Sequence, residues 1–212
     1  MKQKPFVIAM TGASGSVYGV RLVRVLAERN YRMMLTISEA AKTVIGEELG
    51  VEICDLKNPE FLVALFGAQA VSQLEYFYCH DLKAPIASGS FPTQGMIIVP
   101  ASTACFSRVA NGISNSLIER AAECTIKESH KLVIVPRETP LSEIHLENLL
   151  KLVRVGVRVV PAMPAFYSGC HSVEEMVDFV VGKVLDQFEI EHMLYPRWTG
   201  SQTPDRFQEK GF

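Results

Sequence analysis

The feature that most constrains the fold is an apolar segment near the start of the chain, which ends in small residues and runs into a helical pattern. Pro5–Met10 is apolar, and Thr11–Gly15 reads Thr-Gly-Ala-Ser-Gly. Glycine lets a backbone approach an anion closely, and the first turn of a helix presents unpaired N–H groups. The segment therefore predicts a strand, a turn that binds phosphate, and a helix.

The glycine spacing narrows the choice of ligand. Gly12, Gly15 and Gly19 give G-x-x-G-x-x-x-G, which departs from the G-x-G-x-x-G fingerprint of dinucleotide-binding proteins. The next strand ends at Ser38 without the acidic residue that would bind a ribose. We therefore expect a mononucleotide rather than NAD, although a Gly/Ser turn between a strand and a helix is also ordinary loop chemistry.

Length and charge favour a single domain that binds small molecules. The 212 residues are 48% hydrophobic and 21% charged, with a formal net charge of −2 and no basic cluster. This balance gives little support to nucleic-acid or membrane binding. The apolar runs are short and no signal-peptide pattern is found, so we expect a cytoplasmic protein. Residues 1–190 are predicted to form one domain, followed by a C-terminal tail over 191–212.

Cysteine and histidine spacing gives no sign of a metal or of a disulfide framework. The five cysteines are odd in number and lack a C-x-x-C pair, so we expect reduced thiols. The five histidines lack an H-x-x-x-H spacing. No metal is predicted.

Strand and helix patterns alternate along the chain. Segments such as 95–100 and 131–136 are apolar on both faces, which is typical of a parallel sheet covered by helices on each side. The predicted fold is a three-layer Rossmann-like or flavodoxin-like α/β sandwich with a mostly parallel sheet. Expected strands span 5–11, 32–37, 95–100, 131–136 and 157–161, and expected helices 15–29, 38–49, 142–155 and 172–188, with further helices within 102–128.

Two segments are less regular. Residues 52–94 contain a helix near 59–66 and a strand near 73–78, and the long stretch is predicted to form a loop over the site. The tail from Ile190 to Phe212 lacks periodicity, so we expect it to pack on a neighbouring chain or to stay mobile.

The predicted site lies in the loops that follow the strands, where ligands collect in doubly wound sheets. Each candidate there also has a structural interpretation. Ser38 and Ser102 are good helix N-caps, and Arg137 with Glu138 is compatible with a solvated pair in a turn. Glu48 lies near the end of its helix, which is an unfavourable place for a carboxylate in the helix dipole.

A second group lies on the predicted helix 114–128. Arg120, Cys124 and Lys127 share one face there, while Glu123 and Lys127 have the spacing of a helix salt pair.

Several motifs in one order resemble the UbiX-type flavin prenyltransferases, and they cover nearly the whole chain. They are Met10–Gly15, Ala87–Ser90, Pro100–Thr103, Leu117–Ala122, Pro136–Leu141, His145–Asn148, Pro164–Tyr167 and Pro196–Trp198. The resemblance implies transfer of a dimethylallyl group from dimethylallyl monophosphate to N5 and C6 of reduced FMN. The product, prenylated FMN, would serve a UbiD-type decarboxylase. The resemblance also implies a homo-oligomer, often a dodecamer.

The resemblance assigns roles to particular residues. It implies that FMN is held by Gly12, Ala13, Ser14, Ser38, Ser102, Thr103, Ala104, Cys105 and Arg137. Tyr167 and Lys183 would contact the prenyl phosphate, and Arg120 and Lys127 would add positive charge, with Lys127 acting across a subunit boundary. The proton-transfer roles fall to Ser14, Glu48 and Glu138. Because no aspartate-rich magnesium motif is present, cationic side chains must neutralise the leaving phosphate.

Two departures and two alternatives accompany this interpretation. Lys183 stands where the family pattern has arginine, and Ala104-Cys105 replaces Gly-Thr, which removes a hydroxyl near the flavin. An FMN-dependent cysteine-type decarboxylase typically needs a catalytic histidine and a Pro-Ala-Ser-Ala-Asn motif, whereas this chain has Thr103-Ala104-Cys105. A non-catalytic flavin-binding protein would not need Glu48, Glu138 or Lys183.

Overall fold

A computed structural model of the chain describes residues 3–53, 60–166, 172–198 and 200. Its chain contacts divide the protein into two compact units, Met1–Ala162 and Met163–Phe212. The first unit contains the sheet, and the second contains one described helix, α8. The single domain expected over 1–190 stays a prediction.

The sheet has six strands, all of them parallel, in the order β3-β2-β1-β4-β5-β6. Their bounds are β1 Phe6–Met10, β2 Met33–Ile37, β3 Leu74–Tyr78, β4 Gly95–Ala101, β5 Leu132–Pro136 and β6 Arg158–Val159. This is the doubly wound order of Rossmann-type folds, with its switch point between β1 and β4. The predicted α/β fold class is confirmed.

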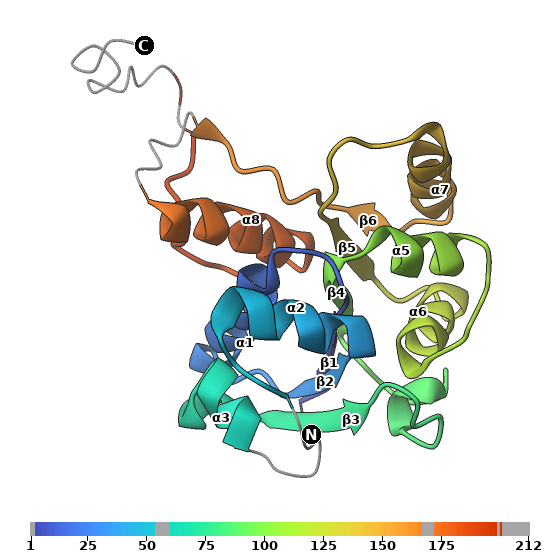
Figure 1. Cartoon of the computed structure of the whole chain (residues 1–212), viewed down its shortest axis with the longest axis horizontal. Coiled ribbons are helices and arrows are strands. Elements are labelled where there is room, and N and C mark those ends of the chain that lie inside the picture. The colour runs from blue at the N-terminus through green and yellow to red at the C-terminus, as the bar shows by residue number, and fades with distance from the viewer. Residues whose placement is uncertain (1–2, 54–59, 167–171, 199, 201–212) are drawn as a thin grey trace. The chain divides into compact units, whose positions relative to one another are not determined.

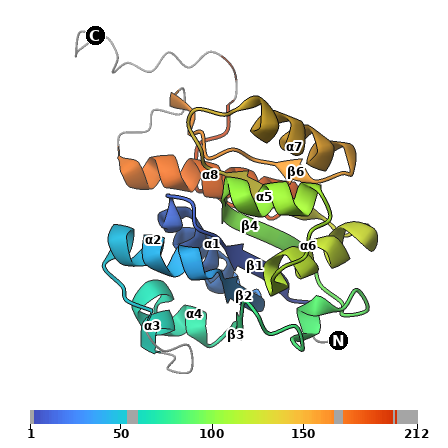
Figure 2. The ribbon, with the colours of Figure 1, turned by 45° about the vertical axis from the view of Figure 1, so that its right-hand side comes forward.

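The helices cover both faces of the sheet in the first unit, as Figures 1 and 2 show. One face carries α1 Ser16–Glu28, α2 Glu39–Leu49, α3 Glu60–Phe66 and α4 Ala68–Val71, and the other carries the 3-10 turn η1 Pro85–Ala87, α5 Thr103–Ala110, α6 Leu117–Lys127 and α7 Glu143–Arg154. Alternate residues of each strand therefore enter two different cores. Val7, Met34, Met96 and Ile134 join the core beneath α5 and α6, and they are almost fully buried.

The segment 52–94 differs from the loop expected over the site. Its described residues form α3, α4 and β3, and β3 is the edge strand that pairs with β2. Ala84 and Ile86 then enter the core shared with α6. This segment therefore completes the sheet, with α3 and α4 packed against α1 on one face and η1 packed against α6 on the other.

The second unit contains α8 Val173–Gln187 and a described tail that folds back onto it. A Cβ atom placed on Gly182 would lie 2.6 Å from ring atoms of both His192 and Tyr195, so the helix needs glycine at that point. Asp186 accepts hydrogen bonds from Tyr195 Oη at 2.6 Å and from Arg197 at 2.7 and 2.9 Å. The tail up to Arg197 thus packs on its own chain, and its packing on a neighbouring chain stays a prediction.

Candidate functional site

Each glycine of the β1–α1 turn has a different structural role. A Cβ atom on Gly12 would lie 2.5 Å from Ala40 Cβ, so the turn passes closely over the start of α2. Gly15 has φ of 104°, a left-handed conformation that glycine adopts without strain. A Cβ atom on Gly19 would lie 2.6 Å from Val99 O, which lets α1 pack closely on β4. The spacing therefore serves the packing of this turn as well as any ligand.

Thr11 joins the ends of the two strands that flank the switch point. Its buried hydroxyl donates to Pro100 O at 2.8 Å and accepts from Ser102 N at 2.7 Å. The end of β1 and the start of α5 are thereby held in one arrangement. Sequence reasoning missed this residue, and the only available signal was a threonine at the carboxyl end of an apolar strand.

Glu48 reaches from the last turn of α2 to the first turn of α1. Its carboxylate accepts hydrogen bonds from Gly15 N at 2.9 Å and from Ser16 N at 2.8 Å. Partial burial raises the pKa of Glu48, but hydrogen bonds from Ser14, Gly15 and Ser16 outweigh it, so the pKa lies below its ordinary value. Glu48 is therefore ionised at neutral pH. Its place near the C-terminus of α2 is unfavourable for a carboxylate, but its contact with the N-terminus of α1 is favourable.

This contact changes the expected place of the phosphate. The amides of Gly15 and Ser16, which the glycine turn offers to an anion, already bind the Glu48 carboxylate. A ligand phosphate would compete with that carboxylate at α1. The starts of α2 and α5 are therefore the better candidates for binding phosphate.

Ser38 and Ser102 are the N-caps of these two helices, as the sequence indicated. Ser38 Oγ accepts from Ala41 N at 3.1 Å, and Ser102 Oγ accepts from Cys105 N at 3.3 Å. Burial raises the pKa of Cys105 to about 12, and its side chain lies in the core. Only the backbone of Cys105 is therefore placed to contact a ligand, whereas Ala104 is exposed.

Arg137, which follows β5 directly, contacts the β1–α1 turn. Its Nε donates to Ser14 O at 3.2 Å, while Glu138 accepts from the backbone N of Thr139 at 3.0 Å. The two side chains thus bind different partners and are not the solvated pair that was the structural alternative. Ser14, Glu48 and Arg137 come from three separate loops or helices and converge on one turn.

The predicted cations on α6 contact a different part of the chain. Arg120 Nε and Cys124 Sγ both donate to Ala87 O, at 3.1 and 3.3 Å, which confirms that they share a face of the helix. Lys127 pairs with Glu128 at 2.6 Å instead of with Glu123. Within the described hydrogen bonds and ion pairs, neither Arg120 nor Lys127 joins the β1–α1 turn.

The remaining substrate-binding candidates lie beyond the first unit. Lys183 is on α8, where its Nζ lies 3.4 Å from Asp186 Oδ2. Tyr167 falls outside the described residues. The structure thus brings the flavin-binding candidates of the first unit to one edge of the sheet, and it leaves the phosphate-binding candidates of the prenyl donor on other elements.

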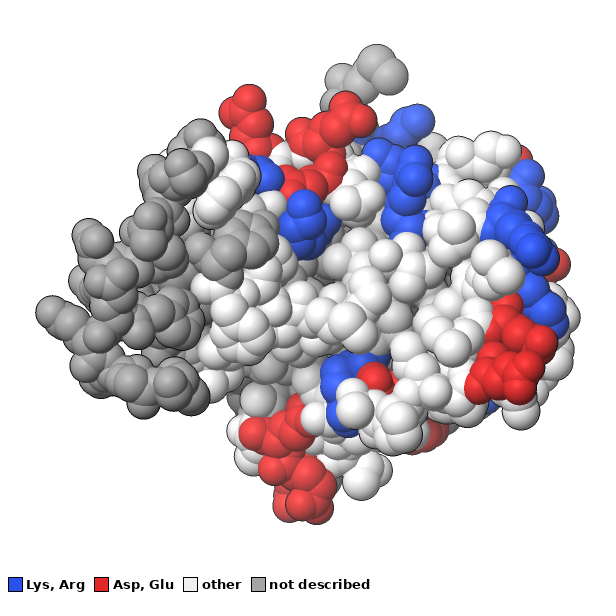
Figure 3. All heavy atoms as spheres, turned by 90° about the horizontal axis from the view of Figure 1, so that it is seen from above, with Lys and Arg blue, Asp and Glu red and all other residues white. Residues whose placement is uncertain are grey.

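The charged surface and the hydropathy of the helices bear on the expectations from composition. Figure 3 shows small groups of basic and acidic side chains separated by uncharged surface over the described part of one face. Among the described helices, none combines the length and apolar composition that a membrane span requires.

The fold and this turn define a doubly wound α/β protein with its candidate site at the switch point of the sheet, and comparison with known proteins identifies the family. The family model named Flavoprotein matches residues 1–185. The chain is 47% identical over 195 residues to a flavin prenyltransferase UbiX of Halalkalibacterium halodurans. The aligned residues cover 91% of this chain and 92% of that protein. The chain therefore belongs to the flavoprotein family, and within it to the UbiX flavin prenyltransferases.

Two solved structures support the same placement. AnUbiX (PadA1), solved with FMN and dimethylallyl pyrophosphate, has a TM-score of 0.84 and 35% identity, covering 95% of this chain and 100% of that one. A dodecameric FMN-dependent UbiX-like decarboxylase from Escherichia coli O157:H7 has a TM-score of 0.79 and 40% identity, covering 93% and 100%.

Proposed function

We propose that this protein transfers a dimethylallyl group from dimethylallyl monophosphate to N5 and C6 of reduced FMN, which yields prenylated FMN. The observation that carries the proposal is the convergence of Ser14, Glu48 and Arg137 at the switch point of a flavoprotein fold. A protein that only stored flavin would need the turn and Arg137, but it would not need an ionised carboxylate held beside them.

The flavin is proposed to lie along the edge of the sheet between the β1–α1 turn and the start of α5. Gly12 and Ala13 keep the turn small, and Ser38 and Ser102 mark the helix starts that suit the phosphate. Thr103, Ala104, the backbone of Cys105 and Arg137 would hold the rest of the flavin. These residues fit FMN because they combine backbone donors, hydroxyls and one cation on small side chains at one edge of the sheet. Reduced FMN supplies the nucleophilic ring atoms.

Glu48 is proposed to accept the proton that the flavin loses when a new bond forms. Its lowered pKa keeps it ionised, so it acts as a base rather than as an acid, and Ser14 hydrogen-bonds to it. Glu138, beside Arg137, is proposed to give a proton to the departing phosphate. The two glutamates are thus proposed to have opposite tasks, Glu48 as the base and Glu138 as the acid.

Cationic residues are proposed to neutralise the leaving phosphate without a metal. Lys183 and Tyr167 would contact it, and Arg120 and Lys127 would add charge from another copy of the chain. A homo-oligomer explains why these residues lie on elements apart from the β1–α1 turn, and the dodecameric relative supports such an assembly. We further propose that the product passes to a UbiD-type decarboxylase and that the protein works in the cytoplasm.

The direct test is anaerobic incubation with reduced FMN and dimethylallyl monophosphate, followed by mass analysis of the extracted flavin. The proposal predicts a mass gain of one dimethylallyl unit. A parallel sample with the diphosphate donor tests which ester is used. Unchanged flavin with both donors, in protein that binds FMN, would instead favour a flavin-binding protein or a cysteine-type decarboxylase, and the latter is tested by adding a C-terminal cysteine peptide with oxidised FMN.

Glu138→Gln provides the matched test of the acid. The variant keeps the size of the side chain and its acceptor oxygen for Thr139 N, but it cannot supply the same proton. We expect unchanged FMN binding and a rate of transfer lowered by about 100-fold or more. A rate equal to that of the wild type would make Glu138 purely structural.

A further inference from the structure

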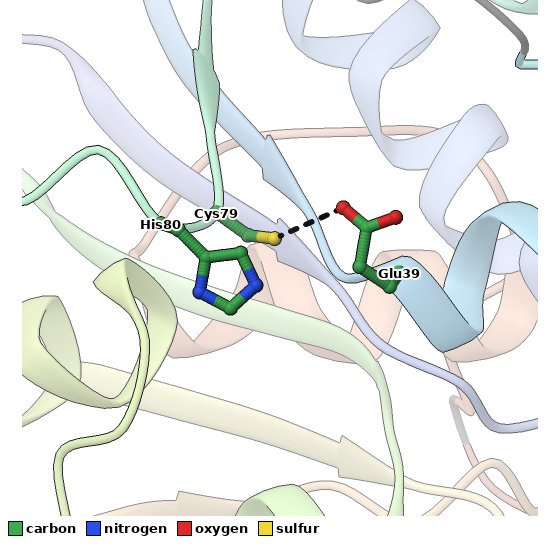
Figure 4. Close-up of side chains that lie close together, drawn as sticks. All are labelled: Glu39, Cys79 and His80. Atoms are coloured by element: carbon green, nitrogen blue, oxygen red, sulfur yellow. Dashed lines mark hydrogen bonds between the residues drawn. The ribbon is translucent and has the colours of Figure 1, made fainter.

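The edge of the sheet beyond β2 and β3 gathers three side chains of the kinds that bind transition metals. The two strands are paired so that Ile37 lies opposite Tyr78 at their carboxyl ends. Glu39 follows β2 by two residues and opens α2, and Cys79 and His80 follow β3 directly. Because parallel strands end at the same edge, these residues emerge side by side. Figure 4 shows the three side chains together, with Cys79 Sγ directed at the Glu39 carboxylate.

The geometry of this cluster is compact and partly fixed by the fold itself. One ligand atom from each of Glu39, Cys79 and His80 lies within 4.8 Å of the other two. Cys79 is 2% exposed and its backbone O accepts from Leu117 N at 2.7 Å, which anchors it to α6. The ring of His80 packs edge-on against Tyr78 at 5.3 Å. Glu39 and His80 are exposed, so an ion has access to the cluster from solvent.

We propose that Glu39, Cys79 and His80 bind a divalent transition metal of the zinc class, with a fourth position open to water. Sulfur, imidazole nitrogen and carboxylate oxygen together suit Zn²⁺, whereas Mg²⁺ and Ca²⁺ prefer oxygen ligands alone. Three protein ligands and one open position form a tetrahedral site that can exchange its ion. The site does not depend on the prenyl-transfer function.

Two features oppose binding of the ion: the ammonium group of Lys42 and the proton of the Cys79 thiol. Each leads to a measurable prediction. Lys42 Nζ lies 2.7 Å from Glu39 Oε1 and also 5.3 Å from the centre of the Tyr78 ring. The ion must displace this ammonium from the carboxylate or share the carboxylate with it. The Cys79 thiol must also lose its proton, because the thiolate is the form of cysteine that binds a metal. Binding should therefore release a proton and tighten as the pH rises.

Titration of the purified protein with Co²⁺ tests the site, because tetrahedral Co²⁺ gives visible bands at wavelengths longer than those that flavin absorbs. We expect such bands, their loss on addition of Zn²⁺, and release of about one proton per ion, measured by calorimetry in buffers of different ionisation enthalpy. Cys79→Ser should abolish the tetrahedral spectrum, and His80→Ala should weaken Co²⁺ binding about 10-fold or more. Lys42→Ala should tighten it.

His130→Ala and Cys124→Ser are the matched controls, since these residues lie outside the cluster. Circular dichroism of each variant confirms that it is folded. Tetrahedral bands that persist unchanged in both Cys79→Ser and His80→Ala would overturn the proposal, as would the absence of any tetrahedral spectrum in the wild type at millimolar Co²⁺. Altered Co²⁺ binding in the His130→Ala or Cys124→Ser controls alone would place the ion elsewhere and would also contradict it.

Discussion

At the scale of single residues, the site depends on how closely two backbone segments approach. The β1–α1 turn passes over Ala40 at the start of α2, and no side chain larger than hydrogen fits at Gly12 without a shift. The same close approach lets Glu48, from the end of α2, reach the amides of Gly15 and Ser16. Packing and chemistry are therefore coupled at this turn.

Gly12→Ala tests that coupling. The new methyl group would lie 2.5 Å from Ala40 Cβ, and neither backbone segment can move as a flexible side chain would. We expect the free energy of unfolding to fall by about 1–3 kcal/mol, measured by urea denaturation, and FMN affinity to fall with it. Gly46→Ala, within α2, is the control, because the nearest atom to its new Cβ would be Val51 O at 3.9 Å. There a helical glycine is replaced, and stability should rise by about 0.5–1 kcal/mol. Equal effects of the two substitutions would contradict the account.

Asp186 gives a prediction about pH. Partial burial raises its pKa, but hydrogen bonds from Arg197, Tyr195 and His192 outweigh this and hold the pKa far below its ordinary value of 3.8. A carboxyl with a lowered folded-state pKa stabilises the protein above its unfolded-state pKa, and this contribution is lost as the pH falls. Asp186→Asn should lower the free energy of unfolding by about 1–3 kcal/mol near neutral pH.

The difference between wild type and Asp186→Asn should shrink as the pH falls below about 4, measured by denaturant unfolding across that range. Glu47→Gln is the control, because Glu47 is an exposed carboxylate on α2, outside the hydrogen bonds of Asp186. A difference that stays constant with pH would mean that the charge of Asp186 is not what stabilises the tail.

Among the strands, the sequence predicted most fully those whose residues show the clearest hydrophobic pattern. The central strands β1, β2, β4 and β5 were predicted to within two residues, because burial on both faces makes them continuous apolar runs. The position of β3 was also predicted, but its role as the sheet edge was not, because it is only partly buried and its side chains alternate weakly. The break between α5 and α6 contains Gly112, whose φ is 66°.

The outer face of α7 carries apolar side chains that a lone chain leaves exposed. Leu146, Leu150 and Val153 follow one another at helical spacing and are 53%, 48% and 52% exposed. An open groove of about 470 Å³ lies beside this helix, bordered by Val109, Ile126 and Val155. Such a surface suits a second copy of the chain, in line with the proposed homo-oligomer.

Leu150→Glu should weaken this self-association. A charge placed in the middle of the stripe would be buried at the contact without a partner, so we expect a smaller assembly by light scattering after gel filtration. Glu147→Lys, an exposed polar position on the same helix, should leave the assembly intact. A Leu150→Glu variant with the molar mass of the wild type would show that the stripe lies outside the contact.

At the scale of the whole molecule, the class of site was predictable from the sequence and its internal contacts were not. Ligands collect beyond the carboxyl ends of parallel strands, and this rule selected loops that the fold does bring to one edge of the sheet. The contact of Glu48 with α1 joins residues more than thirty positions apart, and no local pattern encodes it. For the same reason, the cluster of Glu39, Cys79 and His80 escaped a search for short metal-binding spacings.

A crystal structure of the protein with FMN is the decisive measurement, since every proposed role depends on where the flavin lies. We expect the flavin ring between the Gly12–Ser14 turn and the Ser102–Cys105 segment, with Arg137 beside it and the phosphate at the start of α2 or α5. A structure with FMN bound elsewhere, and with the β1–α1 turn free of ligand contacts, would contradict the account.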